Sequence, residues 1–219
     1  MKNYTIRFLL ISGITLALLG IASCSGKQAA SASNTSQGSS SAAGQSATAG
    51  SGGSSTSGGA AGASLPALDS GYKKVQKDGF TVQWKVDGKN LDVAVSYATT
   101  GWVGVGFGTT GLMEGSNIII GYVNNGNVTI EDDYGNAPNR HASDTSLGGT
   151  DNISNKQGAV TNGTTELRFS IPLDSGDSND VVLTPGKPYK VILAHGPTGA
   201  NDLTAYHGAR GHAVVDITL

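Results

Sequence analysis

The sequence predicts an all-β protein, an antiparallel β-sandwich of about eight to ten strands, and three observations predict it. From about residue 65 onward, apolar and polar residues alternate, which is the pattern of half-buried strands. Two such runs flank the turn Asp87-Gly88-Lys89-Asn90, a strong hairpin signal. About 22 of the roughly 155 residues in this part are glycine, near twice the usual 7%, as expected where turns and bulges are frequent.

Alternation and turn residues together give the strands in chain order. A second hairpin turn is expected at Asn124-Asn125-Gly126-Asn127. The longest stretch without strand character is 135–155, which either lines a pocket or forms an ordered cap without chemistry. The eight predicted strands are 80–86, 91–97, 102–107, 117–123, 128–133, 166–171, 189–194 and 213–219.

The N-terminus has the features of a bacterial lipoprotein signal. Lys2 and Arg7 precede an apolar run of about 15 residues, too short for a membrane span of about 20. Its end, Ile21-Ala22-Ser23-Cys24, resembles a lipobox, in which the cysteine becomes the lipid-carrying N-terminus. We therefore expect a signal peptide at 1–23 and lipidation of Cys24. The alternative is a plain signal peptide with an incidental cysteine.

Between the lipid and the fold, a disordered linker is expected at 24–64. Ser, Gly and Ala make up 32 of the 40 positions in 25–64, so this segment has almost no apolar surface to bury. A flexible chain of this length reaches about 35 Å. The predicted folded domain is 65–219. It would be anchored to a bacterial membrane only through the N-terminal lipid and would face the periplasm or the cell exterior.

Charge and cysteine content exclude several classes of function. The folded part carries 11 basic and all 16 acidic residues, a net charge of −5, which argues against nucleic acid as a partner. One cysteine excludes an intrachain disulfide framework, a cysteine-based zinc site and covalent c-type haem. The sequence contains no G-x-S-x-G, Walker or H-E-x-x-H motif, so we expect an electron-transfer or binding module and not an enzyme.

The residues alone leave the ligand-binding candidates open. Met113 is the single methionine left after signal removal, and it lies in a predicted loop between two strands. Methionine in a β-sandwich is most often core filler. The histidines are His141, His195, His207 and His212.

Several motifs in the right order resemble the DOMON domain family. Gly101-Trp102-Val103-Gly104-Val105-Gly106-Phe107-Gly108 matches its Gly-Trp strand. The segment from Met113-Glu114-Gly115-Ser116-Asn117 to Val123 matches its Met-containing loop and the following apolar strand. The resemblance covers about 140 residues, 79–219, and its further matches are 131–134, 167–169, 177–180, 192–196 and 206–211.

The resemblance implies an Ig-like β-sandwich that binds haem or sugars. In the haem-binding branch, which includes the cytochrome domain of cellobiose dehydrogenase, one Met and one His hold b-type haem. By motif position these ligands are Met113 and His207, which makes the haem iron the expected metal. Thioether and imidazole are good axial ligands of iron, and without C-x-x-C-H the haem b would be non-covalent.

Other residues of the site follow from the same resemblance. Arg210 either pairs with a haem propionate or is a structural surface residue. If His207 is not the ligand, His212 and His195 are the alternatives, whereas His141 is expected to face solvent. The aromatic residues expected to wall the pocket are Trp102, Phe107, Tyr122 and Tyr206.

The acidic turn Asp174-Ser175-Gly176-Asp177-Ser178-Asn179-Asp180 raises calcium as a ligand. It lacks the twelfth-position Glu of an EF-hand loop, and Asp, Asn, Ser and Gly are also ordinary turn formers. Both interpretations stay open from sequence.

The function expected from all these features is a membrane-anchored extracytoplasmic haem b protein. It would pass single electrons between redox partner proteins in the periplasm or at the cell surface. The alternative is a carbohydrate- or surface-ligand-binding module without haem. The pair Met113 and His207 separates the two, since a sugar-binding module has no need for it.

Overall fold

The computed structural model describes residues 64–108, 110–208 and 210–219. The predicted signal peptide, Cys24 and all but the last residue of the predicted linker lie outside these residues. Among the residues described, there is no helix of the length and apolar character that crossing a membrane requires.

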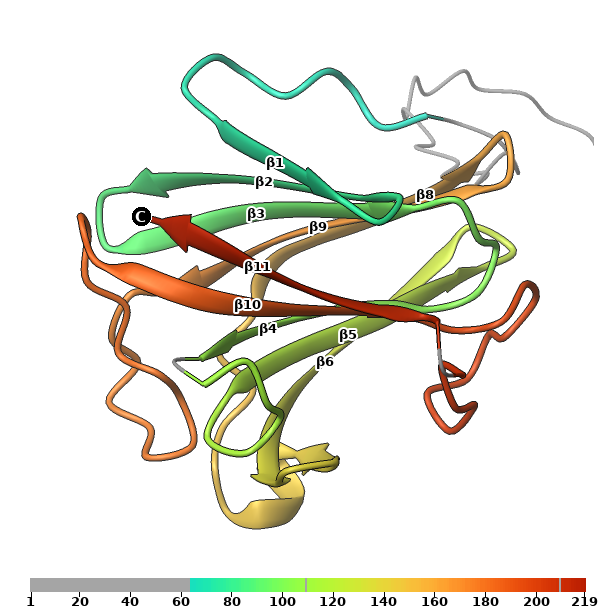
Figure 1. Ribbon diagram of the computed structural model, residues 1–219. Coiled ribbons are helices and arrows are strands. Elements are labelled where there is room, and N and C mark those ends of the chain that lie inside the picture. Colours follow the sequence, from blue (N-terminus) through green and yellow to red (C-terminus); the bar gives the residue numbers. More distant parts are fainter. Residues whose placement is uncertain (1–63, 109, 209) are drawn as a thin grey trace, which may run out of the picture. The chain divides into compact units, whose positions relative to one another are not determined.

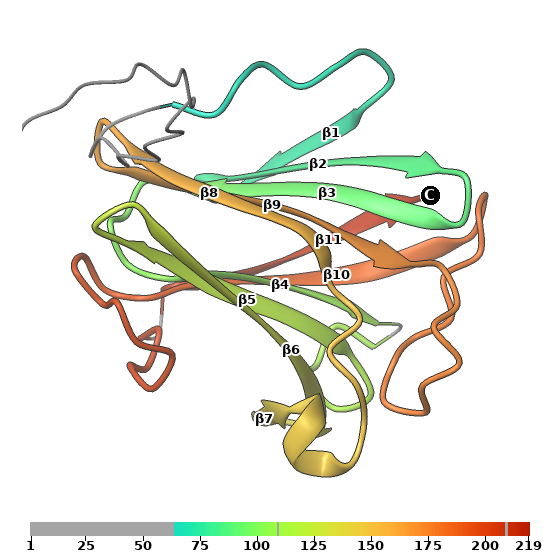
Figure 2. The same cartoon turned by 180° about the vertical axis from the view of Figure 1, so that it is seen from behind.

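In the described residues, eleven strands form two antiparallel sheets that stack face to face (Figure 1, Figure 2). The five-stranded sheet consists, from edge to edge, of β1 (Lys73–Lys77), β2 (Phe80–Asp87), β3 (Asn90–Tyr97), β9 (Thr164–Pro172) and β8 (Ser154–Thr161). The six-stranded sheet consists of β11 (His212–Thr218), β10 (Pro188–His195), β4 (Val103–Gly108), β5 (Asn117–Asn124), β6 (Asn127–Ala137) and β7 (Arg140–Ser143). A 3-10 helix, η1 (Asp144–Leu147), follows β7.

This architecture confirms the predicted fold class, and both predicted hairpins are present. The β2–β3 hairpin turns at Gly88-Lys89, and the β5–β6 hairpin turns at Asn125-Gly126. Asn125 and Gly126 have φ of +50° and +81°, as a type I′ turn requires at both central positions. Asp78-Gly79 and Asn162-Gly163 have the same signs and close the β1–β2 and β8–β9 hairpins, two turns that we did not predict.

The expected count of eight to ten strands was low because β1, β7 and β8 were not predicted. Each of them lies at the edge of a sheet and buries few side chains, so its sequence lacks the alternation that marks a central strand. The expectation that 135–155 lacks strands was also wrong. That stretch contains the end of β6, all of β7, η1 and the start of β8.

The core lies between the two sheets, where the inward residues of each strand meet. In β3 these are Leu91, Val93 and Val95, and in β4 they are Val103 and Val105. Because side chains alternate along a strand, the other face of the six-stranded sheet takes no part in this core. The β4–β5 loop, the β6–β7 hairpin and the loop between β10 and β11 all extend on that outer side (Figure 1).

Candidate functional site

The outer face of the six-stranded sheet is flat and apolar at its centre because β4 places glycines there. Val103 and Val105 point into the core, so Gly104 and Gly106 lie on the outer face. Across the ladders, Gly106 is opposite Ile118 of β5 and Ile192 of β10. A Cβ at Gly106 would lie 2.7 Å from Ile192 Cγ1 and 3.0 Å from Ile118 Cγ1, so the two isoleucines close over this position.

A cavity of about 320 Å³ covers this face, a size at the lower end of the range for small-molecule sites. Its rim includes the exposed Leu112 and Val214, so the cavity opens to solvent there. The wall of the cavity is mostly apolar, and three histidines add imidazole nitrogens to it. The residues that line it from the loops and strand ends are Trp102, Gly111, Leu112, Met113, Pro138, Asn139, His141, His207 and His212.

Met113 lines the cavity from a β4–β5 loop that is tied closely to β6. The Met113 carbonyl accepts a hydrogen bond of 2.9 Å from the Ser116 N–H. Gly115 and Gly135 bond through their backbones at 2.8 Å, and Gly135 N–H donates to Ser116 at 2.9 Å. A Cβ at Gly135 would fall on the Met113 carbonyl, so only glycine fits below this loop. The backbone of Met113 is therefore held in place.

His207 lines the same cavity from the loop between β10 and β11. Trp102 holds this loop, since its indole Nε1–H donates to the Ala205 carbonyl at 3.0 Å. The His207 Nδ1 lies 2.6 Å from the Gly208 carbonyl oxygen, which fixes the tautomer with Nδ1 as donor. Nε2 then keeps its lone pair, which is the arrangement of a metal-binding imidazole.

Two other histidines also line the cavity. His212 begins β11 and lies edge-on to His207, with ring centroids 5.2 Å apart. His141 is on β7, and its Nδ1 is 2.5 Å from Asp133 Oδ2. The expectation that His141 faces solvent was wrong, because the β6–β7 hairpin turns its ring toward the cavity and a buried carboxylate.

His195 lies elsewhere, on the inner side of β10. Its ring stacks on Tyr97 with centroids 3.8 Å apart and is 5.8 Å from Phe80. It does not line the cavity, so among the alternatives to His207 only His212 is within the site.

Of the four aromatic residues predicted as walls, the cavity includes only Trp102. Phe107 is 0% exposed and packs in the core, because it follows the same alternation as Val103 and Val105. Tyr122 is half-buried farther along β5. Tyr206 is 76% exposed and stacks on the outer side of His207, with ring centroids 4.4 Å apart.

Arg210, predicted as a propionate partner, is exposed and does not border the cavity. It follows the His207 loop directly, on the way to β11.

Comparison with models of known protein families identifies the family of this domain. The family model for the DOMON domain matches residues 76–196, more than half of the chain. The chain belongs to the DOMON family. The match includes Met113 and the strands of the cavity floor from β4 to β10, and it ends before His207.

Among solved structures, two cytochrome domains are similar to this chain. The chain is similar to the cytochrome b domain of pyranose dehydrogenase from Coprinopsis cinerea, with 14% identity and a TM-score of 0.50 over 67% of this chain and 81% of that chain. For the cytochrome domain of cellobiose dehydrogenase from Myriococcum thermophilum, the values are 12%, 0.49, 68% and 81%. The likeness to the Coprinopsis domain shows a shared fold.

A third structure comes from Bacteroides uniformis, a protein for which carbohydrate binding has been suggested. It has 14% identity and a TM-score of 0.34, over 67% of this chain and 76% of that chain.

Proposed function

We propose that this DOMON domain binds one haem b non-covalently and carries single electrons between redox partner proteins outside the cytoplasm. The observation that carries the proposal is that Met113 and His207, from two separate loops, line one apolar cavity. The shared fold of the cytochrome b domain of pyranose dehydrogenase supports it.

The two proposed ligands differ in how they are held. His207 has its Nδ1–H engaged by the Gly208 carbonyl, which leaves Nε2 to bind iron. Met113 offers a neutral thioether from a loop whose backbone is tied to β6. Methionine ligation raises the reduction potential of haem relative to two histidines.

The floor of the cavity fits a flat apolar group. Gly104 and Gly106 have no side chains to rise from the sheet, and Ile118, Ile120 and Ile192 offer only hydrocarbon. Such a wall excludes water and leaves few polar groups to satisfy. Haem supplies the one-electron iron couple, whereas the chain binds and orients it; no residue is assigned a catalytic role.

An absorption spectrum of the purified full-length chain supplied with haem tests the proposal. We expect a Soret band and a low-spin spectrum at one haem per chain. His207→Ala should lose most of the haem, because it removes the stronger ligand. Met113→Leu keeps the bulk of the side chain, so it should retain haem with altered ligation and a lower potential.

Two histidine variants are the controls. His195→Phe keeps a ring stacked on Tyr97 and should leave the spectrum and haem content unchanged. His212→Ala removes the nearby alternative ligand and should also leave a low-spin spectrum. A folded wild-type chain without a Soret band contradicts the haem proposal. Low-spin spectra that stay unchanged in both Met113→Leu and His207→Ala would keep haem but overturn this choice of ligands.

The alternative function, binding of a carbohydrate or another surface ligand without haem, is supported by the exposed ring of Tyr206. An exposed aromatic face is suited to the apolar face of a sugar ring. If haem does not bind, Tyr206→Ala should weaken carbohydrate binding, which a glycan-array or calorimetric measurement would detect.

The proposed site of action depends on Cys24, which lies outside the described residues. We propose that the mature chain is lipid-anchored through this cysteine and faces the periplasm or cell exterior. Cys24→Ala should leave the protein soluble or unprocessed, as seen by cell fractionation and by its size on a gel. A Cys24→Ala protein that remains on the membrane at the mature size would contradict lipidation.

A further inference from the structure

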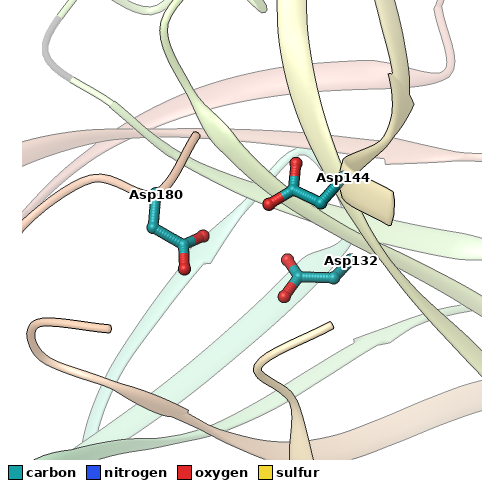
Figure 3. A group of neighbouring side chains, drawn as sticks. All are labelled: Asp132, Asp144 and Asp180. Carbon is teal, nitrogen blue, oxygen red and sulfur yellow. The ribbon is translucent and has the colours of Figure 1, made fainter. Parts of the chain in front are cut away.

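Three carboxylates from three separate elements meet at one end of the sandwich. Asp132 is on β6, Asp144 begins η1, and Asp180 lies in the loop between β9 and β10. One oxygen of each lies within 4.8 Å of the other two. Figure 3 shows the three side chains pointing toward a shared space from different sides. We call this group the acidic cluster.

The acidic cluster is buried without a compensating positive charge. Asp144 is 0% exposed and neither of its carboxylate oxygens has a hydrogen-bond partner in the described part of the chain. Asp132 is 3% exposed, and its Oδ1 is likewise unpartnered. Among the described residues, none of the ion pairs formed by Lys, Arg or His includes Asp132, Asp144 or Asp180. A buried carboxylate in this state is costly unless something neutralises it.

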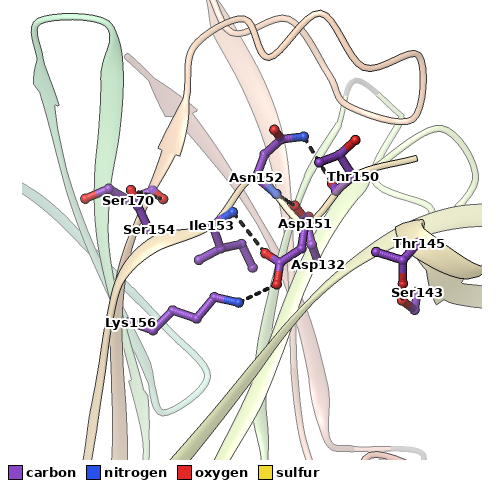
Figure 4. A network of polar contacts seen from close by, with 10 residues as sticks. All are labelled: Asp132, Ser143, Thr145, Thr150, Asp151, Asn152, Ile153, Ser154, Lys156 and Ser170. Carbon is purple, nitrogen blue, oxygen red and sulfur yellow. Dashed lines mark hydrogen bonds and ion pairs between the residues drawn. The ribbon is translucent and has the colours of Figure 1, made fainter. Parts of the chain in front are cut away.

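The hydrogen bonds that do reach the acidic cluster come from neutral groups. Asn152 N–H donates to Asp132 Oδ2 at 2.9 Å (Figure 4), and the Asn152 side-chain amide donates to Asp180 Oδ2 at 3.1 Å. Asn117 donates its side-chain Nδ2–H to Asp180 Oδ1. The carbonyl oxygen of the same Asn117 side chain is buried and unpartnered. It is a fourth oxygen, neutral and of the type that hard cations accept.

Burial and the neighbouring negative charges both make it unfavourable for these carboxyl groups to ionise. Burial, and then the other carboxylates nearby, raise the pKa of Asp144 to about 7. Burial also raises the pKa of Asp132 to about 7 and that of Asp180 in the same direction.

We propose that the acidic cluster is a binding site for one Ca²⁺ ion, with Asp132, Asp144 and Asp180 as ligands. All the candidate ligand atoms are hard oxygens, which excludes the soft or nitrogen-rich sites of zinc and copper. The three oxygens are at most 4.8 Å apart, so an ion at their centre lies within about 2.8 Å of each, which is that limit divided by √3. This range includes the 2.3–2.6 Å of Ca²⁺–oxygen bonds, and three carboxylates favour Ca²⁺ over Mg²⁺, which usually keeps several waters and takes one or two carboxylates.

The ion would tie the β9–β10 loop to β6 and η1, to which no strand pairing joins that loop. Asp180 belongs to the acidic turn that the sequence raised as a calcium candidate, but its partners come from β6 and η1. In that turn, Asp174 and Asp177 accept hydrogen bonds from backbone N–H groups, as ordinary turn residues do. The proposal does not depend on haem, because none of the three ligands borders the cavity.

Calorimetric titration and thermal melts of the purified full-length chain, stripped with EDTA, test the site. Ca²⁺ should bind at one ion per chain with a Kd at or below about 1 mM, the range of extracellular calcium modules. It should raise the Tm by several degrees, and Mg²⁺ at the same concentration should raise it less.

Two ligand variants and one matched control complete the test. Asp144→Asn and Asp180→Asn each remove one charge from the acidic cluster and should weaken Ca²⁺ binding at least about tenfold. Asp174→Asn removes the same charge from the same loop, keeps an oxygen for the Gly176 N–H, and should bind Ca²⁺ like the wild type. The proposal is wrong if the wild type shows neither heat nor a Tm shift with Ca²⁺ up to about 10 mM, above the millimolar range cited. It is equally wrong if both cluster variants bind as tightly as Asp174→Asn.

Discussion

Strand β6 separates two buried regions that differ in whether a carboxylate finds a positively charged or histidine partner. Asp133 pairs across the ladder with Ile118 and so faces the cavity side, where His141 supplies a partner 2.5 Å away. Its neighbour Asp132 pairs with Ile119 and faces inward to the acidic cluster, where the described residues supply no cation. The cavity is therefore a mostly neutral, apolar site, and the acidic cluster is a site with excess negative charge. The two neighbours show that successive residues of one strand face different environments. Whether a carboxylate of β6 meets a histidine or other carboxylates depends on the side of the sheet that it faces.

The largest predicted effect concerns the acidic cluster without metal. Because burial raises the pKa of Asp132 and Asp144 to about 7, the folded state keeps protons that the unfolded chain, with pKa near 3.8, has lost. The stabilising contribution of these protons is complete below about pH 4 and disappears as the pH rises to about 7. In EDTA, the free energy of unfolding should fall across that window by up to about 1.4 kcal/mol per pH unit for each such proton.

The control for this prediction is Asp144→Asn, which mimics the protonated side chain. Denaturant unfolding in EDTA should show the variant gaining stability relative to the wild type as the pH rises from 4 to 7. A difference between the two proteins that is constant with pH contradicts the prediction. The carboxylates that surround Asp144 and act on it are Asp180, Asp177, Asp133 and Asp151.

The next effect concerns the cavity side, where a single methyl group should displace Met113. In Gly135→Ala, the new Cβ would overlap the Met113 carbonyl, so the loop must move. We expect a loss of about 2–3 kcal/mol in the free energy of unfolding, together with altered ligation in the haem spectrum. Gly104→Ala is the matched control, since its Cβ would meet Ile120 Cγ1 at an ordinary 3.4 Å and should cost under about 1 kcal/mol. Equal losses in the two variants would show that Gly135 does not position Met113.

The smallest predicted effect concerns the other ligand loop and uses the two tryptophans. Trp102→Phe removes the hydrogen bond to the Ala205 carbonyl, so we expect a loss of about 1–2 kcal/mol and weaker haem binding. Trp84→Phe removes a buried indole N–H that has no partner in the described residues, so no hydrogen bond is lost. Denaturant unfolding and haem titration of both variants measure the difference. Haem affinity that is unchanged in Trp102→Phe would show that the indole hydrogen bond does not support haem binding.

The fold could be predicted from sequence wherever a strand buries every second residue. Strand β2, with Phe80, Val82 and Trp84 all buried, shows why the prediction succeeds. The edge strand β1 shows why it fails elsewhere. Its exposed lysines protect an open edge but produce no alternation, and only the Asp78-Gly79 turn after it was a usable signal.

The candidate site could be predicted only in part. The alternation of β4 was visible in the sequence, and it would have placed Phe107 on the core side with Val105 and away from Gly104 and Gly106. The pair Met113 and His207 came from the family resemblance and not from any local pattern. The acidic cluster has no local signature, because Asp132, Asp144 and Asp180 meet only after β6, η1 and the β9–β10 loop have packed together.

The pairing of β4 with β10 has a consequence for the order in which the molecule folds. These strands join residues 82 to 92 positions apart, from Gly108 with Lys190 to Val103 with His195, whereas β5 to β7 are linked by two-residue turns. Local hairpins close quickly, and long-range pairings form late because more chain entropy is lost. Since Met113 follows β4 and His207 follows β10, the cavity is complete only once this slow step is finished. We therefore expect a ligand that needs both loops to bind only chains that have already folded.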